Sequence, residues 1–346
     1  MTTRRKTVLV TGGAGFIGCN FVHYLRRRYP EYKVLVLDAL TYAGNTENLP
    51  EIYRQNSNFA FWYGDICNGE LIDTLVGQSD VVVHFAAETH VTRSIYDNQI
   101  FFKTDVLGTQ TIANSVVKYA KSVERFIHIS SSEVYGTAQT ELMSEEHPLV
   151  PLSPYAAAKA GADRLVYSYW STYGIPAVIV RAFNNYGAYQ HLEKVVPRFV
   201  TSCILNEPLT VHGDGTSMRD WLFVQDMCAA LDLVMHSEIS TVKGEVFNIG
   251  TGRSEDILTL AEMILKEMRK PRTFIKHIGD RPGQVVRHTA STDKALNVLG
   301  WKPKTDLESG LAKTIAWYKK NRKWWGKMLW MKEIPIVTKS GKVELH

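Results

Sequence analysis

Tyr155 and Lys159 are the residues whose types and spacing most directly suggest chemistry. Ser153 and Pro154 precede them and are typical of a helix start, and a spacing of four places both side chains on one helical face. An ammonium group beside a phenol favours the phenolate, so we expect the pKa of Tyr155 to fall from its usual value of about 10 towards neutral pH. Such a phenolate can accept a proton from a substrate hydroxyl. Because this pair recurs by chance in many chains, the prediction needs a second motif.

A serine-rich segment with one carboxylate, Ser130-Ser131-Ser132-Glu133, follows a predicted strand upstream of this pair. Ligands bind parallel sheets at the carboxyl ends of the strands, which is where these hydroxyls and the Glu133 carboxylate lie. The segment is therefore a candidate catalytic loop. The alternative is a serine-rich turn in which Glu133 is simply solvated.

A glycine-rich turn near the N-terminus supplies the second motif. Gly12, Gly15 and Gly18 follow the first predicted strand and open the first predicted helix. Here the first glycine permits a tight turn, the second lets the backbone approach a pyrophosphate, and the third lets helix and strand pack closely. The positive end of the helix dipole then faces the phosphates. The intervening Phe16 and Ile17 belong to the same predicted dinucleotide site.

An acidic residue, Asp38, closes the second predicted strand about 20 residues after Gly18. A carboxylate there binds both ribose hydroxyls and repels a 2′-phosphate, so NAD is favoured over NADP. Residues at the ends of neighbouring predicted strands are expected to border the dinucleotide: Thr41, Asp65, Ile66, Ala86 and Ala87. Together, the two motifs predict that Tyr155 takes a proton from a sugar hydroxyl while hydride leaves to the nicotinamide.

Short apolar runs alternate with amphipathic stretches through the first half of the chain. Strands are predicted at Thr7–Val10, Lys33–Leu37, Phe59–Tyr63, Val81–Phe85, Arg125–Ile129 and Ala177–Val180. Helical patterns lie between them, including Cys19–Arg28 and Thr109–Ala120. This alternation predicts an α/β fold with a Rossmann-type, doubly wound parallel sheet.

The alternation of strands and helices is less regular in the second half of the chain, where we expect a smaller C-terminal α/β substrate lobe. Helices are predicted at Pro197–Leu205, Met227–Met235, Ile257–Met268 and Leu311–Lys320. The expected boundaries are 1–183 plus about 222–252 for the NAD-binding domain, about 184–221 and 253–330 for the lobe, and 331–346 for a C-terminal tail. The tryptophan-rich segment from Trp324 onward is expected to pack over a surface or a partner subunit.

Composition excludes several classes of protein. The 346 residues are 45% hydrophobic and 22% charged, which is typical of a globular chain with a sizeable core and excludes disordered, collagen-like and coiled-coil chains. A net charge of +5 is too small for a nucleic-acid-binding surface, and no stretch approaches the ~20 apolar residues that span a membrane. The four cysteines are widely spaced, which predicts free thiols and a cytoplasmic location. We expect no metal site and neither a nucleic-acid nor a membrane partner.

With these motifs in place, the chain resembles an extended short-chain dehydrogenase/reductase that acts on nucleotide sugars, and most of all the dTDP-glucose 4,6-dehydratase family. The resemblance covers nearly the whole chain. It is carried by segments that are long and specific, namely Asp38–Asn45, Ala86–Ser94, Glu193–Pro197, Arg219–Trp221, Asn248–Gly250 and Asp280–Gly283.

The resemblance implies roles for individual residues. Tyr155 is the base for the C4 hydroxyl, and Lys159 tunes it and holds the nicotinamide ribose. Ser131 matches the family's active-site Ser/Thr, and Glu133 matches the carboxylate that takes the C5 proton once C4 is a ketone. Hydride passes from C4 to NAD and returns to C6, so NAD stays bound through turnover. The resemblance also implies residues that hold the nucleotide-sugar substrate: Glu88, Asn185, Lys194, Arg219, Asn248 and Arg287.

Ser132 is a departure from this family, which has an Asp there that protonates the departing C6 hydroxyl. An alkyl hydroxyl is a far weaker proton donor, so elimination needs another acid. Glu133 could do both jobs, as in the GDP-mannose 4,6-dehydratase family, which has a hydroxyl residue before its Glu. UDP-glucuronate decarboxylases also carry Ser-Glu here, but tend to have an arginine just after the Tyr-Gly that is Tyr186-Gly187 in this chain. A 4-epimerase and a non-catalytic NAD-binding protein remain further alternatives.

Two segments, 97–120 and 155–173, carry more apolar and aromatic residues than one core face needs. In the superfamily that this chain resembles, the matching helices form a four-helix seam between two subunits. We therefore expect a homodimer, with a broad core face as the alternative.

Overall fold

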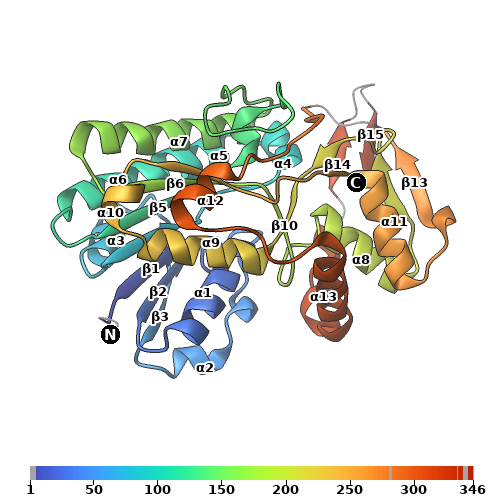
Figure 1. Ribbon diagram of the computed structural model, residues 1–346. Helices are drawn as coiled ribbons and strands as arrows, with labels where there is room; N and C mark the ends of the chain where they lie inside the picture. The colour runs from blue at the N-terminus through green and yellow to red at the C-terminus, as the bar shows by residue number, and fades with distance from the viewer. Residues whose placement is uncertain (1–4, 280–282, 333, 338–341, 346) are drawn as a thin grey trace.

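The computed structural model describes residues 5–279, 283–332, 334–337 and 342–345. Its larger lobe is a sheet with helices on either side, and the smaller lobe lies beside it (Figure 1).

A seven-stranded sheet with the order β11-β6-β5-β4-β1-β2-β3 forms the centre of the larger lobe. Its strands are β1 (Thr7–Thr11), β2 (Lys33–Asp38), β3 (Phe59–Tyr63), β4 (Val81–His84), β5 (Arg125–Ser131), β6 (Ala177–Ala182) and β11 (Val246–Ile249). Every neighbouring pair is parallel. The predicted Rossmann-type doubly wound sheet is confirmed. The strand order reverses between β1 and β4, and ligands bind such sheets at this point.

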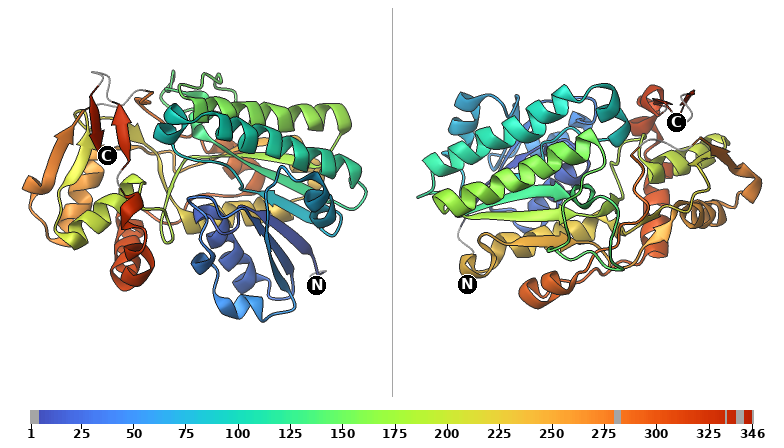
Figure 2. Two further views of the ribbon diagram at one scale, coloured as in Figure 1. Left: turned by 180° about the vertical axis from the view of Figure 1, so that it is seen from behind. Right: turned by 90° about the horizontal axis from the view of Figure 1, so that it is seen from above.

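Helices cover both faces of the sheet because successive strand residues point to opposite faces and both sets are apolar (Figure 2). Val8 and Val10 of β1 share a core with Phe21 and Leu231, whereas Leu9 belongs to a core on the other face. The helices of the first face are α1 (Phe16–Arg28), α9 (Val224–His236) and α12 (Asp293–Leu299), and those of the second are α3 (Gly69–Val76), α6 (Thr109–Lys118) and α7 (Pro154–Tyr173). Short elements connect them: η1 (Thr46–Asn48), α2 (Glu51–Arg54), α4 (Val91–Tyr96), α5 (Gln99–Phe101), the π-helix η2 (Phe102–Gly108), η3 (Ser132–Tyr135) and α10 (Ile239–Val242).

The smaller lobe has a core of its own, in which Phe199, Leu260, Tyr318 and Trp325 are fully buried. Its strands pair in twos: β7 (Asn184–Tyr186) with β10 (Trp221–Phe223), β8 (Leu209–His212) with β13 (Ile275–Ile278), and β9 (Met218–Arg219) with β12 (Glu255–Asp256). Its helical elements are α8 (Val195–Leu205), α11 (Ile257–Met268), η4 (Arg272–Phe274), α13 (Leu307–Lys320), α14 (Arg322–Gly326) and η5 (Leu329–Met331).

The structure differs from the sequence prediction in several element bounds, and three of the differences bear on the site or the lobes. The first helix begins at Phe16 rather than Cys19, because the glycine turn runs directly into it. The segment 97–120 is helical from Gln99 to Lys118, but a wider π-helical stretch interrupts it at Phe102–Gly108. Residues 293–301 were expected in the substrate lobe, yet Ala295, Leu299 and Trp301 pack in the core of the larger lobe.

The C-terminal segment is tied into both lobes. Trp325 is buried in the smaller lobe, and the indole of Trp324 donates to Asn48 Oδ1 at 2.8 Å. Asn48 Nδ2 donates in turn to the carbonyl of Ala14, at 2.7 Å, inside the glycine-rich turn. Beyond these residues, β14 (Pro335–Val337) pairs with β15 (Val343–Leu345) in an antiparallel hairpin. Among the described residues, no helix combines the length and apolar character that a bilayer crossing requires.

Candidate functional site

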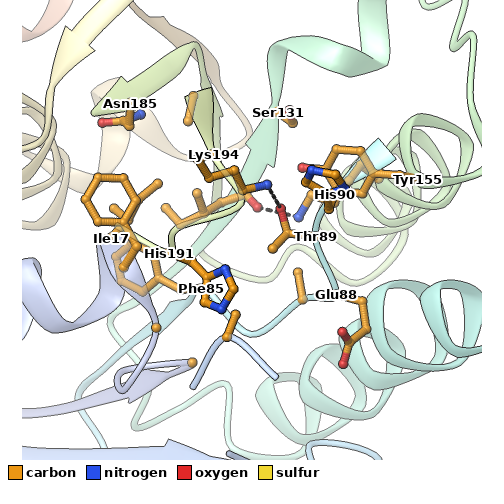
Figure 3. Close-up of a pocket in the computed structure, with 18 of the residues that line it drawn as sticks. Ile17, Phe85, Glu88, Thr89, His90, Ser131, Tyr155, Asn185, His191 and Lys194 are labelled. Atoms are coloured by element: carbon orange, nitrogen blue, oxygen red, sulfur yellow. Dashed lines mark hydrogen bonds between the residues drawn. The ribbon is translucent and has the colours of Figure 1, made fainter. Parts of the chain in front are cut away.

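A cavity of about 490 Å³ opens at the carboxyl ends of β1, β4 and β5 and continues into the smaller lobe (Figure 3). Every catalytic and cofactor-binding residue predicted from the sequence lines it. Four of the six predicted substrate residues do so as well: Glu88, Asn185, Lys194 and Arg219.

Asn248 and Arg287 do not line the cavity. Asn248 is fully buried, accepts a hydrogen bond from the Tyr135 hydroxyl, and donates to the Met143 carbonyl. The Arg287 guanidinium donates to the Thr140 carbonyl at 2.6 Å. These two side chains hold protein segments together, and their expected contact with substrate stays a prediction. Of the segment Asp280–Gly283, residues 280–282 lie outside the described part of the chain.

The glycine turn has the shape that a dinucleotide needs. Gly12 has a φ of +68°, and a Cβ added there would lie 2.6 Å from the Ala86 nitrogen. A Cβ on Gly18 would lie 2.2 Å from the Gly12 carbonyl oxygen. Gly15 precedes α1 without a side-chain cap, so the first backbone N–H groups of that helix are available to an anion.

Asp38 lies 8% exposed at the end of β2 and borders the cavity. Its carboxylate accepts the N–H groups of Ala14 and Leu40, both at 2.8 Å. Each carboxylate oxygen retains capacity for a further hydrogen bond, as a ribose diol requires. Burial raises the pKa of Asp38, and the backbone hydrogen bonds oppose that shift. These features fit NAD, which would lie across the ends of β1 and β4. The glycine turn would hold its pyrophosphate, Asp38 would bind a ribose, and the small side chains of Ala86 and Ala87 would leave room for the dinucleotide.

A Gly12→Ala variant is expected to lose both stability and NAD binding. The substitution combines a left-handed backbone with a clash against the backbone of Ala86, which together cost about 2–5 kcal/mol. Urea unfolding and NAD titration measure the two effects. Gly69→Ala is the matched control, because nothing lies within 4 Å of a Cβ at that helical position. An unchanged NAD affinity in Gly12→Ala would contradict the role given to this turn.

Tyr155 lies at the far end of the cavity, where it forms hydrogen bonds with Ser131 and Thr89. Burial raises the pKa of the phenol, and the charges of Asp105 and Glu133 act in the same direction. The two hydrogen bonds oppose the shift without overcoming it. The expected lowering by Lys159 is therefore wrong for the protein without ligands, because burial dominates.

Lys159 is 4% exposed, and its ammonium donates to the Ile129 carbonyl at 2.7 Å. Burial lowers the pKa of Lys159, while the carboxylates of Asp105 and Asp163 act against that shift. Asp163 is itself paired with Arg181 at 2.9 Å. Lys159 thus lines the cavity and belongs to a buried network of charges with Asp105, Asp163 and Arg181.

Asp105 is a buried acid beside this network, on η2. One carboxylate oxygen accepts the Glu88 N–H at 2.7 Å, and the other has no hydrogen-bond partner among the described residues. Burial raises the pKa of Asp105 to about 7, and Lys159 opposes the shift.

The unsubstituted chain is expected to lose folding stability as pH rises from about 4 to 7, whereas an Asp105→Asn variant is not. The free energy of unfolding of the variant relative to the unsubstituted chain should therefore increase over this range. Unfolding lowers the pKa of this carboxyl to about 3.9, so the unfolded chain binds fewer protons in that window and the native chain loses stability with rising pH. The loss reaches roughly 4 kcal/mol above pH 7 and is absent in the amide. Urea unfolding at several pH values measures it, with the value near pH 4 as internal reference. A difference that does not change with pH would contradict the assignment.

The serine-rich loop follows the end of β5 and turns into η3 beside the cavity. Ser131 caps η3 by accepting the Glu133 N–H at 3.2 Å, which turns the Glu133 carboxylate into the cavity. Ser132 is buried and lies 3.3 Å from Nδ1 of His288. The same Nδ1 is 4.0 Å from Oε1 of Glu133. His288 Nε2 lies 2.8 Å from the Gly136 carbonyl oxygen, so it carries a proton and donates to that oxygen.

The substrate end of the cavity contains buried polar atoms that the described chain leaves without partners. They are Asn185 Oδ1, Gln190 Oε1 and His191 Nε2, and all three residues line the cavity. Buried polar groups normally form hydrogen bonds, so these three side chains retain hydrogen-bonding capacity beside the cavity. Lys194 adds an ammonium that donates to Thr89 Oγ1 at 3.2 Å (Figure 3).

A buried carboxylate, Glu193, fixes this part of the wall. It accepts hydrogen bonds from the Tyr42 hydroxyl at 2.8 Å and from Arg93 at 2.9 Å. The Arg93 guanidinium also stacks 3.9 Å from the centre of the Tyr42 ring. The network joins loops of the larger lobe to the segment that carries Lys194.

Sequence reasoning missed four groups of this site: Thr89, Gln190, His191 and His288. The first three lie inside or beside segments that carried the family resemblance, which was the available signal. His288 reaches Ser132 from 156 residues away, and no local pattern marks it.

The doubly wound sheet, the glycine turn with Asp38, and the Tyr155–Lys159 pair define an extended short-chain dehydrogenase/reductase with an added lobe. The chain belongs to the GDP-mannose 4,6-dehydratase family, whose model matches residues 9–314. A dTDP-glucose 4,6-dehydratase of Streptomyces niveus is 42% identical over 92% of this chain and 94% of its own length.

Two solved structures show the same architecture. A dTDP-glucose 4,6-dehydratase from Bacillus anthracis, in complex with NAD, matches 93% of this chain and 99% of its own, with 40% identity and a TM-score of 0.86. A UDP-glucose 4-epimerase from Thermotoga maritima, with UDP-glucose, matches 91% and 99%, with 30% identity and a TM-score of 0.83.

Proposed function

We propose that the protein is an NAD-dependent nucleotide-sugar 4,6-dehydratase, which converts a hexose nucleotide into its 4-keto-6-deoxy derivative with loss of water. The observation that carries this proposal is the placement of Tyr155, Lys159 and Glu133 around one cavity that also contains the dinucleotide turn. Bound NAD supplies the hydride acceptor for C4 and the hydride donor for C6.

Tyr155 acts first, by accepting the proton of the C4 hydroxyl as the sugar is oxidised. Its hydrogen bonds with Ser131 and Thr89 favour the phenolate, and the charge of Lys159 lies on the adjacent turn of α7. Burial opposes ionisation, so the reaction gains from a cationic group placed near the phenol. An oxidised nicotinamide is such a group.

Glu133 acts second, once C4 is a ketone and the C5 proton has become acidic. Its carboxylate lines the cavity and is oriented by the Ser131 cap. Removal of the C5 proton creates an enolate, from which the C6 hydroxyl departs when it receives a proton. Reprotonation at C5 and hydride return to C6 complete the product.

The sugar nucleotide extends towards the smaller lobe, where the polar side chains of Asn185, Gln190 and His191 line the cavity. Arg219 is 5% exposed in the cavity wall and supplies a guanidinium suited to a diphosphate. The relatives favour a dTDP-linked glucose as the first substrate to test.

Ser132 keeps a UDP-glucuronate decarboxylase as the second candidate, since that reaction needs no acid at C6. Ala188 follows Tyr186-Gly187 and accepts a hydrogen bond from Asn20 at 3.0 Å, so that position lacks the arginine of the decarboxylases. This favours the dehydratase.

Product mass distinguishes the candidates when the enzyme is incubated with dTDP-, UDP- and GDP-linked hexoses and with UDP-glucuronate. Loss of one water without added reductant supports the dehydratase. Loss of carbon dioxide from the glucuronate would establish the decarboxylase instead. An unchanged mass with an altered sugar configuration would establish an epimerase.

The protein is further proposed to act as a homodimer in the cytoplasm. Exposed apolar side chains gather on α4, α5, η2 and α7: Ile95, Tyr96, Ile100, Phe102, Leu107, Tyr167 and Tyr173. The four cysteines are free thiols, which supports a reducing compartment. Sedimentation equilibrium is expected to give twice the 39.1 kDa chain mass, and a monomer would contradict the proposed seam.

A further inference from the structure

A buried histidine lies behind the two loop residues that frame the elimination step. His288 is fully buried and does not line the cavity. Its Nδ1 is nonetheless 3.3 Å from Ser132 Oγ and 4.0 Å from Glu133 Oε1. One nitrogen atom therefore lies within hydrogen-bond distance of the hydroxyl that stands where an acid is needed, and within 4.0 Å of the carboxylate that takes the C5 proton.

The protonation state of this histidine follows from its other contact. Nε2 donates to the Gly136 carbonyl, so in the neutral ring Nδ1 carries a lone pair. Burial lowers the pKa of His288, with Arg219 acting in the same direction and Glu133 against it. The resting imidazole is therefore neutral and ready to accept a proton at Nδ1.

We propose that His288 is a positioning residue that carries the C5 proton from Glu133 to Ser132, and that Ser132 thereby serves as the acid for the departing C6 hydroxyl. This inference rests on the proposed dehydratase function. It accounts for a loop that lacks a second carboxylate yet belongs to a dehydratase family.

The steps balance in protons and electrons. The C5–H bond breaks, its proton goes to the Glu133 carboxylate, and the electron pair is held as an enolate with the C4 ketone. The proton then passes from Glu133 to His288 Nδ1. As the C6–O bond breaks, the leaving oxygen takes the Ser132 hydroxyl proton, Ser132 takes the Nδ1 proton, and the enolate pair forms the C5–C6 double bond. Water is released, and all three side chains regain their starting states.

Two substitutions isolate the relay. His288→Gln retains a donor for the Gly136 carbonyl but lacks the Nδ1 atom, and Ser132→Asp supplies a carboxylic acid directly. We expect His288→Gln to slow dehydration by about 10²-fold. In the Ser132→Asp background, the same change is expected to cost less than about threefold, because the acid no longer depends on the histidine.

Partial reactions separate a relay from mere damage to the fold. In His288→Gln, cofactor reduction at 340 nm should proceed at the unsubstituted rate, and reduced cofactor should accumulate because elimination is slowed. A nucleotide-linked 6-deoxyhexose has no leaving group at C6, so only oxidation and removal of the C5 proton can occur. With this substrate, His288→Gln should exchange the C5 hydrogen for deuterium in D₂O at the same rate as the unsubstituted enzyme. Both readouts report Tyr155 and Glu133 without the relay.

The outcomes are distinct. If the unsubstituted enzyme releases water and His288→Gln is equally fast, the relay is wrong and the dehydratase stands. If His288→Gln slows oxidation, exchange and dehydration alike in both backgrounds, its role is structural and the relay is overturned. If the unsubstituted enzyme releases no water from any sugar nucleotide, the proposed function fails and the relay with it.

Discussion

A Glu133→Gln variant is expected to lose dehydration by at least about 10³-fold and to bind NAD with unchanged affinity. The amide has the same shape but cannot accept the C5 proton, so the reaction stops after oxidation at C4. Glu133 lies on η3 after β5, whereas Asp38 ends β2 and the glycine turn follows β1, so the substitution is separated from the residues that fit the dinucleotide. Product mass measures the loss of water, and fluorescence titration measures NAD binding.

The position at which the reaction stops makes this test specific. Reduced cofactor should accumulate at 340 nm in Glu133→Gln when substrate is added, because Tyr155 is intact. Glu141→Gln, an exposed carboxylate on the following loop, serves as the matched control and should behave as the unsubstituted enzyme. Full dehydration by Glu133→Gln would show that another group is the base for C5.

A Tyr155→Phe variant is expected to lose oxidation at C4, and with it all later steps, by about 10²- to 10⁴-fold. Removing the hydroxyl takes away the group that accepts the substrate proton at this point of the cavity wall. The ring itself still packs edge-on against Phe101, with centroids 6.1 Å apart, so the fold is preserved.

The readout for Tyr155→Phe is the absence of any absorbance rise at 340 nm after mixing with substrate, in contrast to Glu133→Gln. Tyr63→Phe is the control, because that tyrosine at the end of β3 is 73% exposed and does not line the cavity. An unchanged rate of cofactor reduction in Tyr155→Phe would remove the phenolate from the mechanism.

The parts of the site that could be predicted from sequence are those that depend on local chain geometry. Gly12, Gly15 and Gly18 acquire their roles from one turn between a strand and a helix, and Asp38 follows from the next strand end. The pairing of Tyr155 with Lys159 requires only one helical turn. Alternating apolar runs then predict the parallel sheet that brings these pieces to one edge.

The missed parts depend on packing between distant segments. Lys159 points its ammonium at the Ile129 carbonyl, a backbone atom with no signature in sequence, and burial governs the pKa of Tyr155. His288 approaches Ser132 only because the loop after β13 returns to the larger lobe. Asn248 and Arg287 carry suitable side chains, but their bonds to Tyr135 and Thr140 use them elsewhere.

The hydrogen bonds from Trp324 to Asn48, and from Asn48 to the Ala14 carbonyl, have a consequence for how the protein is made. The ribosome synthesises the dinucleotide turn about 310 residues before the indole that braces it. A nascent chain can form β1 and α1 early, but Asn48 reaches its final bonding only after Trp324 has been synthesised. The brace on the glycine turn is therefore absent while the intervening chain grows, and it forms only when two distant segments pack together.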